Sequence, residues 1–327
     1  MKAFVTGATG FLGSHIADRL LDMGFEVSCF IRGSSNTRWI QNKKINLVEG
    51  TLFQKNKLSE VLKDTDYIFH SAGVVKAKNK RGYIYGNVET TKSLIEIAYN
   101  ANPNLKKFIH ISSLATCGPN PDNRPIDENY NPKPITTYGR TKLQAEYEVL
   151  KYKDKIPINI IRPPAIFGPR DTEILIYFKT FQKGLNSIIG FGKKYLSLIY
   201  VEDLVNGIML AAEKGKDGEI YFISSDNAYN WNEISEVTSK ILEKKPFKIR
   251  IPHWVVYTSG FFAEIFSLFS SKAPTLNIEK CKDITRKNWV CSNEKAKREL
   301  GFTEKYTLEE SFTKTIEWYQ EHKWLKL

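Results

Sequence analysis

Hydrophobic and polar positions along the first half of the chain follow two patterns in regular alternation. Short apolar runs predict β-strands at residues 2–6, 26–31, 46–49, 67–70, 107–113 and 158–162. Segments with a helical period lie between them and predict helices at residues 11–23, 57–63, 87–100 and 137–151. Strands that alternate with helices at this pace predict an α/β fold with a parallel, doubly wound sheet.

The pattern changes beyond Pro163 and Pro164. It predicts helices at 174–183 and 201–213, strands at 197–200 and 219–223, and a mainly helical remainder from about residue 227. We therefore expect two interlocked domains. The first covers residues 1–168 and is rejoined by 195–226, and a smaller, mainly helical C-terminal substrate domain covers 169–194 and 227–327.

Residues 254–270 form the most apolar stretch, and Glu264 is its only charge. This stretch is shorter than the ~20 residues needed to span a bilayer, and it contains Gly260. We expect no transmembrane segment and interpret the stretch as a buried or substrate-lining helix. A helix that lies on a membrane surface is the alternative.

The first strand runs into a glycine-rich turn. Gly7, Gly10 and Gly13 follow residues 2–6 at three-residue spacing, directly before the first helix. The glycines permit a tight turn, a close approach of the backbone to a pyrophosphate, and close packing of helix on strand. The free N–H groups at the helix start then face the anion. This order of strand, turn and helix predicts a phosphate-binding site.

Composition restricts the function classes. The 327 residues are 42% hydrophobic and 26% charged, which is typical of a globular protein. The four cysteines lack the spacing of a zinc site or a disulfide framework, and no leader precedes the first strand. We therefore expect a cytoplasmic protein without a metal site. The net charge of +12 is spread along the chain, and the densest basic segment, 76–81, contains no aromatic residue, so we expect no nucleic-acid partner.

A phenol and an ammonium group stand four residues apart in the helix predicted at 137–151. Tyr138 and Lys142 lie on one face at this spacing, and a nearby cation favours the phenolate, which lowers the pKa of a tyrosine. Ser113 ends the fifth strand, where doubly wound sheets hold their ligands, and its hydroxyl could hydrogen-bond a carbonyl oxygen. These three residues predict acid/base catalysis at a carbonyl or alcohol.

Together with these residues, several motifs resemble the extended short-chain dehydrogenases/reductases, which include sugar-nucleotide epimerases, dihydroflavonol reductases and 3β-hydroxysteroid dehydrogenases. The motifs lie at residues 6–13, 70–73, 87–91, 111–118, 138–142, 162–169, 200–203 and 293–302. The resemblance covers essentially the whole chain. It implies a Rossmann-type NAD(P)-binding domain and a likeness to the NAD-dependent epimerase/dehydratase proteins.

The resemblance also implies roles for individual residues. Tyr138 is the acid/base, Lys142 binds the nicotinamide ribose and tunes Tyr138, and Ser113 polarises the reacting group. Asn87 supports the proton path or the helix that bears it. The residues expected to contact the cofactor are Gly7, Thr9, Gly10, Phe11, Leu12, Gly13, Arg32, Thr51, Leu52, Ala72, Gly73, Ser112, Tyr138, Lys142, Pro163 and Ile166.

The end of the second strand bears on the choice of cofactor. An acidic residue there would bind the 2′-hydroxyl of NAD, whereas this chain has Arg32, which suits a 2′-phosphate in charge and geometry. We therefore favour NADP, and NAD is the alternative. The family usually has Gly-Asp after the third strand, and here Gly50 is followed by Thr51, so the usual carboxylate contact to adenine is in doubt.

Two absences separate the subfamilies. No acidic pair follows Ser113, which disfavours dehydration, and Leu196 stands about where sugar-nucleotide enzymes place an arginine for the diphosphate. Lys193 or Lys194 could compensate from a neighbouring position. These features favour a small, partly hydrophobic substrate and the dihydroflavonol reductase and 3β-hydroxysteroid dehydrogenase branches.

The sequence thus predicts an NADP-dependent oxidoreductase that interconverts a carbonyl and an alcohol by hydride transfer. A sugar-nucleotide epimerase is the alternative enzyme, and a non-catalytic NADP(H)-binding regulatory protein is the alternative of another class. The family often dimerises through the helix that bears the Tyr–Lys pair, so we expect a homodimer. The candidate contact residues are Leu94, Ile95, Tyr147 and Leu150, although core burial could also explain them.

Overall fold

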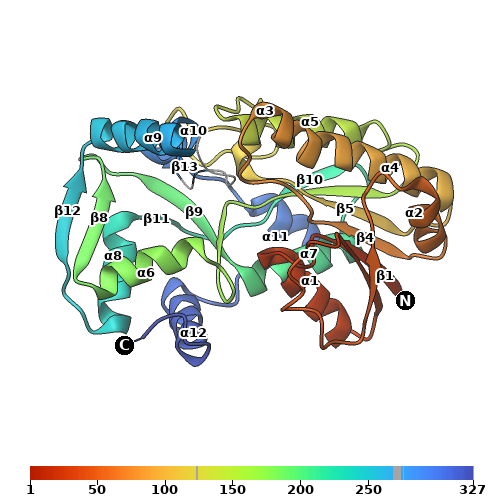
Figure 1. Cartoon of the computed structure of the whole chain (residues 1–327), viewed down its shortest axis with the longest axis horizontal. Helices are drawn as coiled ribbons and strands as arrows, with labels where there is room; N and C mark the ends of the chain where they lie inside the picture. Colours follow the sequence, from red (N-terminus) through yellow and green to blue (C-terminus); the bar gives the residue numbers. More distant parts are fainter. Residues whose placement is uncertain (123, 268–273, 275, 327) are drawn as a thin grey trace.

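A computed structural model describes residues 1–327 apart from 123, 268–273, 275 and 327. Its main element is a seven-stranded sheet in the order β10-β6-β5-β4-β1-β2-β3 (Figure 1). All neighbouring strands pair in parallel, which confirms the predicted doubly wound architecture. The strands are β1 (Lys2–Thr6), β2 (Glu26–Ile31), β3 (Ile45–Glu49), β4 (Tyr67–His70), β5 (Lys107–Ile111), β6 (Ile158–Arg162) and β10 (Glu219–Phe222).

Helices cover both faces of this sheet. Helices α1 (Phe11–Asp22), α7 (Val201–Lys214) and α11 (Glu294–Leu300) lie on one face, and α2 (Lys55–Leu62), α4 (Thr90–Ala101) and α5 (Thr137–Leu150) lie on the other (Figure 1). Successive side chains of a strand point to opposite faces. In β1, Ala3 and Val5 therefore join one hydrophobic core, and Phe4 joins the other. This alternation makes the sheet the middle of three layers.

The part of the molecule outside the seven-stranded sheet and its helices, here called the second lobe, contains more strand than the sequence predicts. One small sheet has the order β11-β9-β13 with β7 against β9, and β8 pairs with β12. These strands are β7 (Ala165–Phe167), β8 (Leu185–Ile189), β9 (Tyr195–Tyr200), β11 (Ala228–Asn230), β12 (Phe247–Ile251) and β13 (Asn288–Trp289). The remainder from about residue 227 is mainly helical, as predicted. The sequence missed most of the short strands, because strands of two to five residues are too short to show a clear period.

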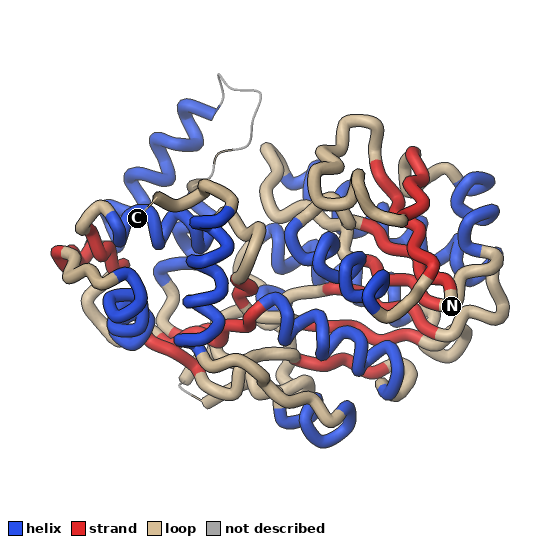
Figure 2. Tube along the Cα trace, turned by 90° about the horizontal axis from the view of Figure 1, so that it is seen from below, coloured by secondary structure: helices blue, strands red, loops and turns tan. Residues whose placement is uncertain are grey.

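The helices of the second lobe surround these small sheets, as Figure 2 shows. They are α6 (Glu173–Gln182), α8 (Trp231–Leu242), α9 (His253–Ser267), α10 (Ile278–Thr285) and α12 (Leu308–Glu321). Within the described residues, no helix has both the length and the apolar character needed to cross a bilayer.

The helix predicted from residue 87 begins earlier and is irregular. It opens with α3 (Lys80–Tyr83), continues as the π-helix η1 (Ile84–Glu89) and becomes regular only in α4. A π-turn widens the helix by one residue per turn, and such turns occur frequently at functional sites. Asn87 lies in this wide turn and is buried.

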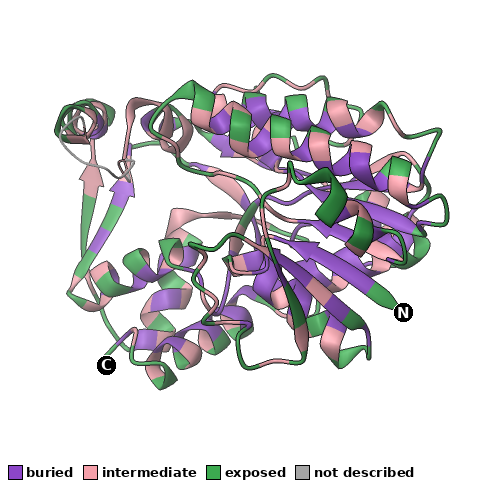
Figure 3. Cartoon of the chain, turned by 45° about the vertical axis from the view of Figure 1, so that its right-hand side comes forward, coloured by how far each residue is buried: buried purple, intermediate pink, exposed green. Residues whose placement is uncertain are grey.

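The helix expected at residues 254–270 is present as α9, but the expectation that it is buried is wrong. In α9 only Val256 and Gly260 are buried, and Figure 3 shows most of this helix as exposed or intermediate. Residues 268–270 lie outside the described residues. Hydropathy indicates that a segment prefers an apolar environment, but it does not indicate whether this chain supplies that environment.

The candidate dimer residues are divided by the fold. Leu94 and Ile95 are fully buried between α4 and the sheet, so core packing explains them. Tyr147 is exposed on α5, and Leu150 is packed against the same core.

Candidate active site

The glycine turn between β1 and α1 is built as the sequence predicts. Gly7 has φ +76°, and a Cβ there would lie 2.7 Å from the Ala72 nitrogen. A Cβ at Gly13 would collide with the Gly7 carbonyl, so α1 packs closely on the turn only because residue 13 is glycine. The exposed Gly10 is the N-cap of α1 and donates its N–H to the Gly7 carbonyl at 2.9 Å. A phosphate approaching the first turn of α1 would therefore meet bare backbone.

The ends of β2 and β3 form the next part of the rim. Arg32 is exposed and lies in a tight turn in which its N–H donates to Ser35 Oγ at 3.1 Å. Among the described residues Arg32 has no ion-pair partner, so its guanidinium remains available to an anion. Glu49 ends β3 opposite Ile31, and its carboxylate packs against Gly33. Sequence reasoning missed Glu49, because only the pairing of β2 with β3 brings it to this loop.

The expected adenine side of the site is formed by the segment after β3. Thr51 is exposed and donates its N–H to Gln54 Oε1 at 3.2 Å, and the Leu52 carbonyl accepts from Ser93 Oγ at 2.6 Å. The carboxamide of Gln54 therefore lies beside the position where the family usually has a carboxylate.

Tyr138 lies in the first turn of α5. The helix starts because Thr136 caps it, with Thr136 Oγ1 accepting from the Gly139 N–H at 3.1 Å. Gly139 lets this turn approach the 3₁₀ turn η2 (Leu114–Thr116) closely, since a Cβ there would collide with the Ala115 carbonyl. Ser113 precedes η2, so the close approach of the two turns brings its hydroxyl to Tyr138.

The electrostatics at Tyr138 oppose ionisation, so the expectation that the nearby Lys142 lowers the pKa of this tyrosine is wrong. Burial raises the pKa of its phenol, and a hydrogen bond with the Ser113 side chain lowers it in part. The carboxylates of Asp283 and Glu173 raise the pKa of Tyr138 further. A protonated phenol beside a serine hydroxyl is suited to donate a proton to a developing alkoxide.

Lys142 lies one turn after Tyr138 on α5 and is buried. Its Nζ donates to the Ile111 carbonyl at 2.6 Å, at the carboxyl end of β5. Burial lowers the pKa of this ammonium group to about 8, while the charge of Glu146 raises it. The structure therefore brings Ser113, Tyr138 and Lys142 to the same end of the sheet, as predicted.

Asn87 connects three parts of the site. Its Oδ1 accepts from the Val74 N–H at 2.7 Å, and its Nδ2 donates to the Val74 carbonyl and to Thr141 Oγ1, both at 3.1 Å. Asn87 thus fixes the loop after β4 to the helix that carries Tyr138. The same loop contains Ala72 and Gly73, and a Cβ at Gly73 would lie 3.1 Å from Asn87 Oδ1.

A buried ion pair joins α5, the helix that carries Tyr138, to the end of β6. Glu146 on α5 and Arg162 at the end of β6 are 1% and 3% exposed, and two bonds of 2.9 and 2.6 Å join them. Ser112 donates its hydroxyl to the same carboxylate, and Arg162 also contacts Cys117 Sγ at 3.5 Å. The Ser112 side chain is therefore directed at Glu146, and its main chain is the part that remains for the cofactor.

Sequence reasoning missed the role of Glu146. The available signal is its position four residues after Lys142, which places the two side chains on one helical face.

Two histidines lie beneath the site on the inner strands. His70 contacts Thr6 Oγ1 at 2.7 Å and Thr91 Oγ1 at 2.8 Å, and the His110 ring lies 5.3 Å from the His70 ring. Burial lowers the pKa of both, to about 3 for His70, and the charge of Lys142 lowers them further. Both imidazoles are therefore neutral at physiological pH and add no positive charge beneath Lys142.

The second lobe closes on Tyr138 from the other side. The carboxylate of Glu279 on α10 accepts from the Thr137 N–H at 2.9 Å and from Arg140 at 3.0 Å. Lys76, in the loop after β4, pairs with Glu173 at the start of α6 at 2.8 Å. Helices α10 and α6 therefore border the turn that carries Tyr138.

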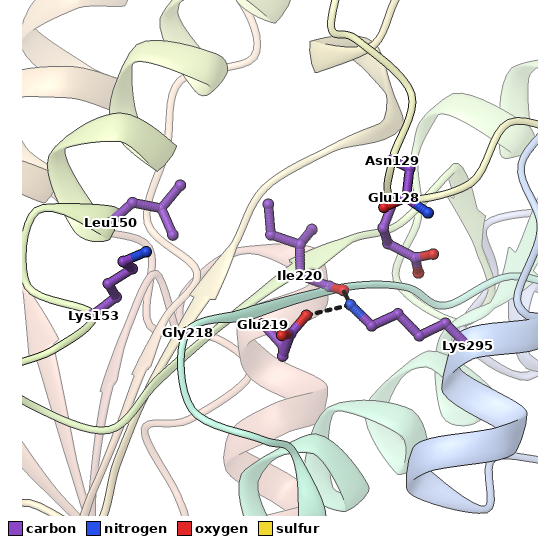
Figure 4. A pocket seen from close by; sticks show the side chains of 8 residues that line it. All are labelled: Glu128, Asn129, Leu150, Lys153, Gly218, Glu219, Ile220 and Lys295. Carbon is purple, nitrogen blue, oxygen red and sulfur yellow. Dashed lines mark hydrogen bonds and ion pairs between the residues drawn. The ribbon is translucent and has the colours of Figure 1, made fainter.

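A hollow of about 420 Å³ lies elsewhere and does not belong to this site (Figure 4). Its lining includes Leu150 and Lys153 from the far end of α5, about 18 Å along the helix from Tyr138. Three of its charged side chains are already engaged, because Lys295 contacts Glu219 at 2.5 Å and Glu128 accepts from the Phe222 N–H at 2.8 Å.

Comparison with known proteins fits this geometry. The sequence profile of the NAD dependent epimerase/dehydratase family matches residues 3–224, which is more than half of the chain. The chain belongs to the NAD dependent epimerase/dehydratase family. It is an NAD(P)-dependent enzyme of the extended short-chain dehydrogenase/reductase type.

Several relatives match this chain over nearly their full length. Ceramide reductase of Caulobacter vibrioides is 26% identical, over 98% of this chain and 95% of its own. Sterol-4-alpha-carboxylate 3-dehydrogenase of Mus musculus is 29% identical, over 97% and 90%. A 4-hydroxy-2-methyl-3-oxo-4-farnesyl-3,4-dihydroquinoline-1-oxide ketoreductase of Stigmatella aurantiaca is 27% identical, over 94% and 93%.

Solved structures in the family share the fold. The crystal structure of gox2253 superposes with a TM-score of 0.82, at 27% identity and with 99% of both chains covered. UDP-glucose 4-epimerase of Thermotoga maritima superposes with a TM-score of 0.81 at 22% identity, over 98% of this chain and 99% of its own. The second likeness shows the common fold alone.

Proposed function

We propose that this protein is an NADP-dependent oxidoreductase that interconverts a carbonyl and an alcohol on a hydrophobic, lipid-like substrate. The observation that carries the proposal is the placement of Ser113 beside Tyr138, next to the buried Lys142. A phenol, a hydroxyl and a cation at the carboxyl end of a parallel sheet are the groups that this reaction needs.

The residues present also fit the nicotinamide cofactor. The bare backbone of the Gly7–Gly13 turn would hold the pyrophosphate, and the Ala72–Gly73 segment and Pro163–Ile166 would flank the rest of the molecule. When bound, the cofactor supplies the hydride in the reductive direction.

The chain's own residues then handle the oxygen and its proton. Ser113 and Tyr138 donate hydrogen bonds to the substrate carbonyl oxygen, which draws electron density from the carbonyl carbon. Tyr138 transfers its proton to the alkoxide that forms, and the ammonium group of Lys142 stabilises the phenolate. Asn87 acts as a positioning residue, because it holds the loop after β4 against α5. Oxidation uses the same groups in reverse.

The proposed substrate class rests on the second lobe and the relatives. Leu196 is half-buried in β9, and the neighbouring Lys194 is buried with its Nζ donating to the Ile284 carbonyl at 3.0 Å. Lys194 is therefore occupied and does not replace the missing arginine of sugar-nucleotide enzymes. The relatives include a ceramide reductase, sterol dehydrogenases and a farnesyl-quinoline ketoreductase, and these names denote enzymes of hydrophobic substrates.

The preference for NADP rests on the free guanidinium of Arg32. An Arg–phosphate contact favours NADPH by roughly tenfold to a hundredfold. The carboxylate of Glu49 near the same loop would oppose a 2′-phosphate, so the two residues act against each other.

Titration of nucleotide-free protein with NADPH and NADH, followed by fluorescence, tests the cofactor and the reaction type. We expect preference for NADPH, lost in Arg32→Asp and increased in Glu49→Gln, followed by oxidation of NADPH with a lipid-like ketone or aldehyde. Preference for NADH would contradict the proposed cofactor. A nucleotide that cannot be washed out, with interconversion of a sugar nucleotide and no net redox change, would instead support an epimerase.

We also propose that the protein is a cytoplasmic homodimer formed through α4 and α5. Tyr99 and Tyr147 are exposed on these two helices, which pack beside each other. Sedimentation of the wild type and of Tyr147→Glu tests this, with a monomeric wild type as the contrary result.

A further inference from the structure

Helix α9 presents its large apolar side chains to the outside. Trp254, Phe261, Phe262, Ile265 and Phe266 are all exposed, with exposed fractions from 38% for Ile265 to 72% for Phe266. Their spacing of three, four, seven or eight residues places them on one face of the helix. Monomeric soluble proteins rarely leave such a contiguous apolar face uncovered.

The opposite face of α9 attaches the helix to the protein. Val256 and Gly260 pack against α10, and Cys281 Sγ donates to the Val256 carbonyl at 3.2 Å. Glu264, the only acidic residue of the helix, turns inward and accepts from the Ile278 N–H at 3.1 Å. The outward face is therefore free of acidic side chains. Figure 2 shows α9, the helix before the grey segment, projecting from the second lobe.

The apolar surface continues into the strands that precede α9. Phe247 on β12 is 73% exposed, and Leu185, its partner on β8, is 41% exposed. Phe191 follows β8 and is exposed, and its carbonyl accepts from Arg250 at 3.1 Å, which ties this loop to β12. We call these residues and the outward face of α9 the aromatic surface.

The segments that carry and adjoin the aromatic surface are strongly basic. Residues 174–201 and 244–263 contain no Asp or Glu and eight basic residues: Lys179, Lys183, Lys193, Lys194, Lys244, Lys245, Lys248 and Arg250. In the described part of the chain, none of the eight forms an ion pair with a carboxylate. Six of the eight are exposed, whereas Lys194 is buried and Arg250 is half-buried. The exposed Glu243 adjoins Lys244, so the charge beside the aromatic surface is net positive.

We propose that the aromatic surface docks on an anionic phospholipid bilayer. Exposed Trp and Phe side chains beside Lys and Arg are the combination that an anionic lipid interface binds, the rings entering the headgroup boundary and the cations contacting phosphates. A second copy of this chain fits less well, because the same excess of basic residues would then lie on both sides of the contact. The charge complementarity therefore selects the bilayer.

The position of α9 relates this surface to the active site. Helix α10 lies between α9 and the catalytic turn, packs on α9, and contacts Thr137 and Arg140 through Glu279. Docking would place the space beside Tyr138 one helix away from the lipid. The docking itself does not depend on the proposed reaction.

Co-sedimentation of the full chain with vesicles tests the docking. We expect binding to vesicles of phosphatidylcholine mixed with phosphatidylglycerol, weaker binding to phosphatidylcholine alone, and a decrease with added salt. Replacing Trp254, Phe262 and Phe266 together by serine should weaken binding at least about tenfold. Lys193→Gln, Lys244→Gln and Lys245→Gln should each weaken it about fivefold.

Matched controls make the result specific. Met23→Ser removes an exposed apolar side chain elsewhere, and Lys57→Gln with Lys92→Gln removes exposed charges from α2 and α4, so these variants should bind vesicles as the wild type does. Tyr138→Phe should also bind normally, which separates docking from catalysis. Failure of the wild type to bind, or equal loss in the controls, would overturn the proposal. So would an aromatic variant that binds vesicles normally but changes from dimer to monomer.

Discussion

Helices α5 and α9 of this protein reverse the usual relation between hydropathy and burial. Helix α5 buries Thr141, Lys142 and Glu146, although its sequence is mostly polar. Helix α9 is the most apolar helix of the chain, yet it exposes its aromatic residues and buries only Val256 and Gly260. Helix α5 carries the turn that contains Tyr138. Helix α10 contacts this turn and packs on α9, so α9 also lies near it.

The two helices depart in different ways from the rule that apolar side chains are buried and charged side chains are exposed. The buried charges of α5 are compensated inside the molecule, because Glu146 has Arg162 and Ser112 as partners and Lys142 has the Ile111 carbonyl. The apolar face of α9 has no compensation within the described residues. Buried charges that have partners inside the protein indicate a functional site. An exposed apolar face without such partners indicates a surface that another molecule covers.

The largest effect is expected at the head of α5. Tyr138→Phe removes the proton donor and leaves the ring, so turnover should fall by about 10²–10⁴-fold. Binding of NADPH should remain within about twofold of the wild type, since the glycine turn is untouched. Steady-state kinetics beside cofactor titration would measure both, and near-normal turnover would refute the role of Tyr138.

A substitution at Glu146 tests how the buried charges of α5 stabilise one another. Glu146→Gln leaves the buried guanidinium of Arg162 without a countercharge, which should reduce the free energy of unfolding by about 3–5 kcal/mol. Loss of the negative charge should also move the pKa of Lys142 below about 8, so the alkaline limb of the pH–rate profile should shift to lower pH. The matched control is Glu148→Gln, whose exposed pair with Lys151 should contribute less than about 1 kcal/mol. If Glu146→Gln and Glu148→Gln reduced the free energy of unfolding in urea equally, the special role of the buried pair would be contradicted.

A smaller and pH-dependent effect is expected at Lys142. Its folded-state pKa of about 8 lies below the ordinary value, so between pH 8 and about 10 the unfolded chain binds more protons than the native one. The contribution of Lys142 to stability therefore rises with pH across this window and is constant below it. Lys142→Met should be more stable than the wild type by about 1–2 kcal/mol at pH 7, and this gain should shrink above pH 8. If the pKa of Lys142 were not lowered, the difference in free energy of unfolding between the variant and the wild type would not change with pH in denaturant unfolding.

The smallest effect is expected on the outward face of α9. Phe266→Ser should change the free energy of unfolding by less than about 0.5 kcal/mol, because the ring is exposed and contributes little to the core. Gly260→Ala on the same helix should reduce stability by about 1–3 kcal/mol, since its Cβ would collide with Cys281 Sγ. Thermal unfolding of both variants measures the contrast, and a large loss in Phe266→Ser would show that the ring packs within the protein.

Several parts of the site could be predicted because they depend on local sequence. The turn Gly7–Gly13 and the Tyr138–Lys142 pair each lie within one strand–helix or helix unit, and their chemistry follows from residue type and spacing. Ser113 could be added because it follows a recognisable strand. The roles of Glu49, Glu279 and Arg162 could not be predicted, since each depends on a contact with a residue distant in sequence.

The sequence by itself determined the parallel sheet, the glycine turn after β1 and the positions of the candidate catalytic residues, because hydrophobic period, glycine positions and helical spacing act over a few residues. Only the tertiary structure decided which side chains the interior covers. The short strands β8 and β12 pair across the second lobe and direct α9 outward, so a segment with the hydropathy of a core helix became a surface. Hydropathy fixes the environment that a side chain prefers, and packing decides whether the protein itself provides it.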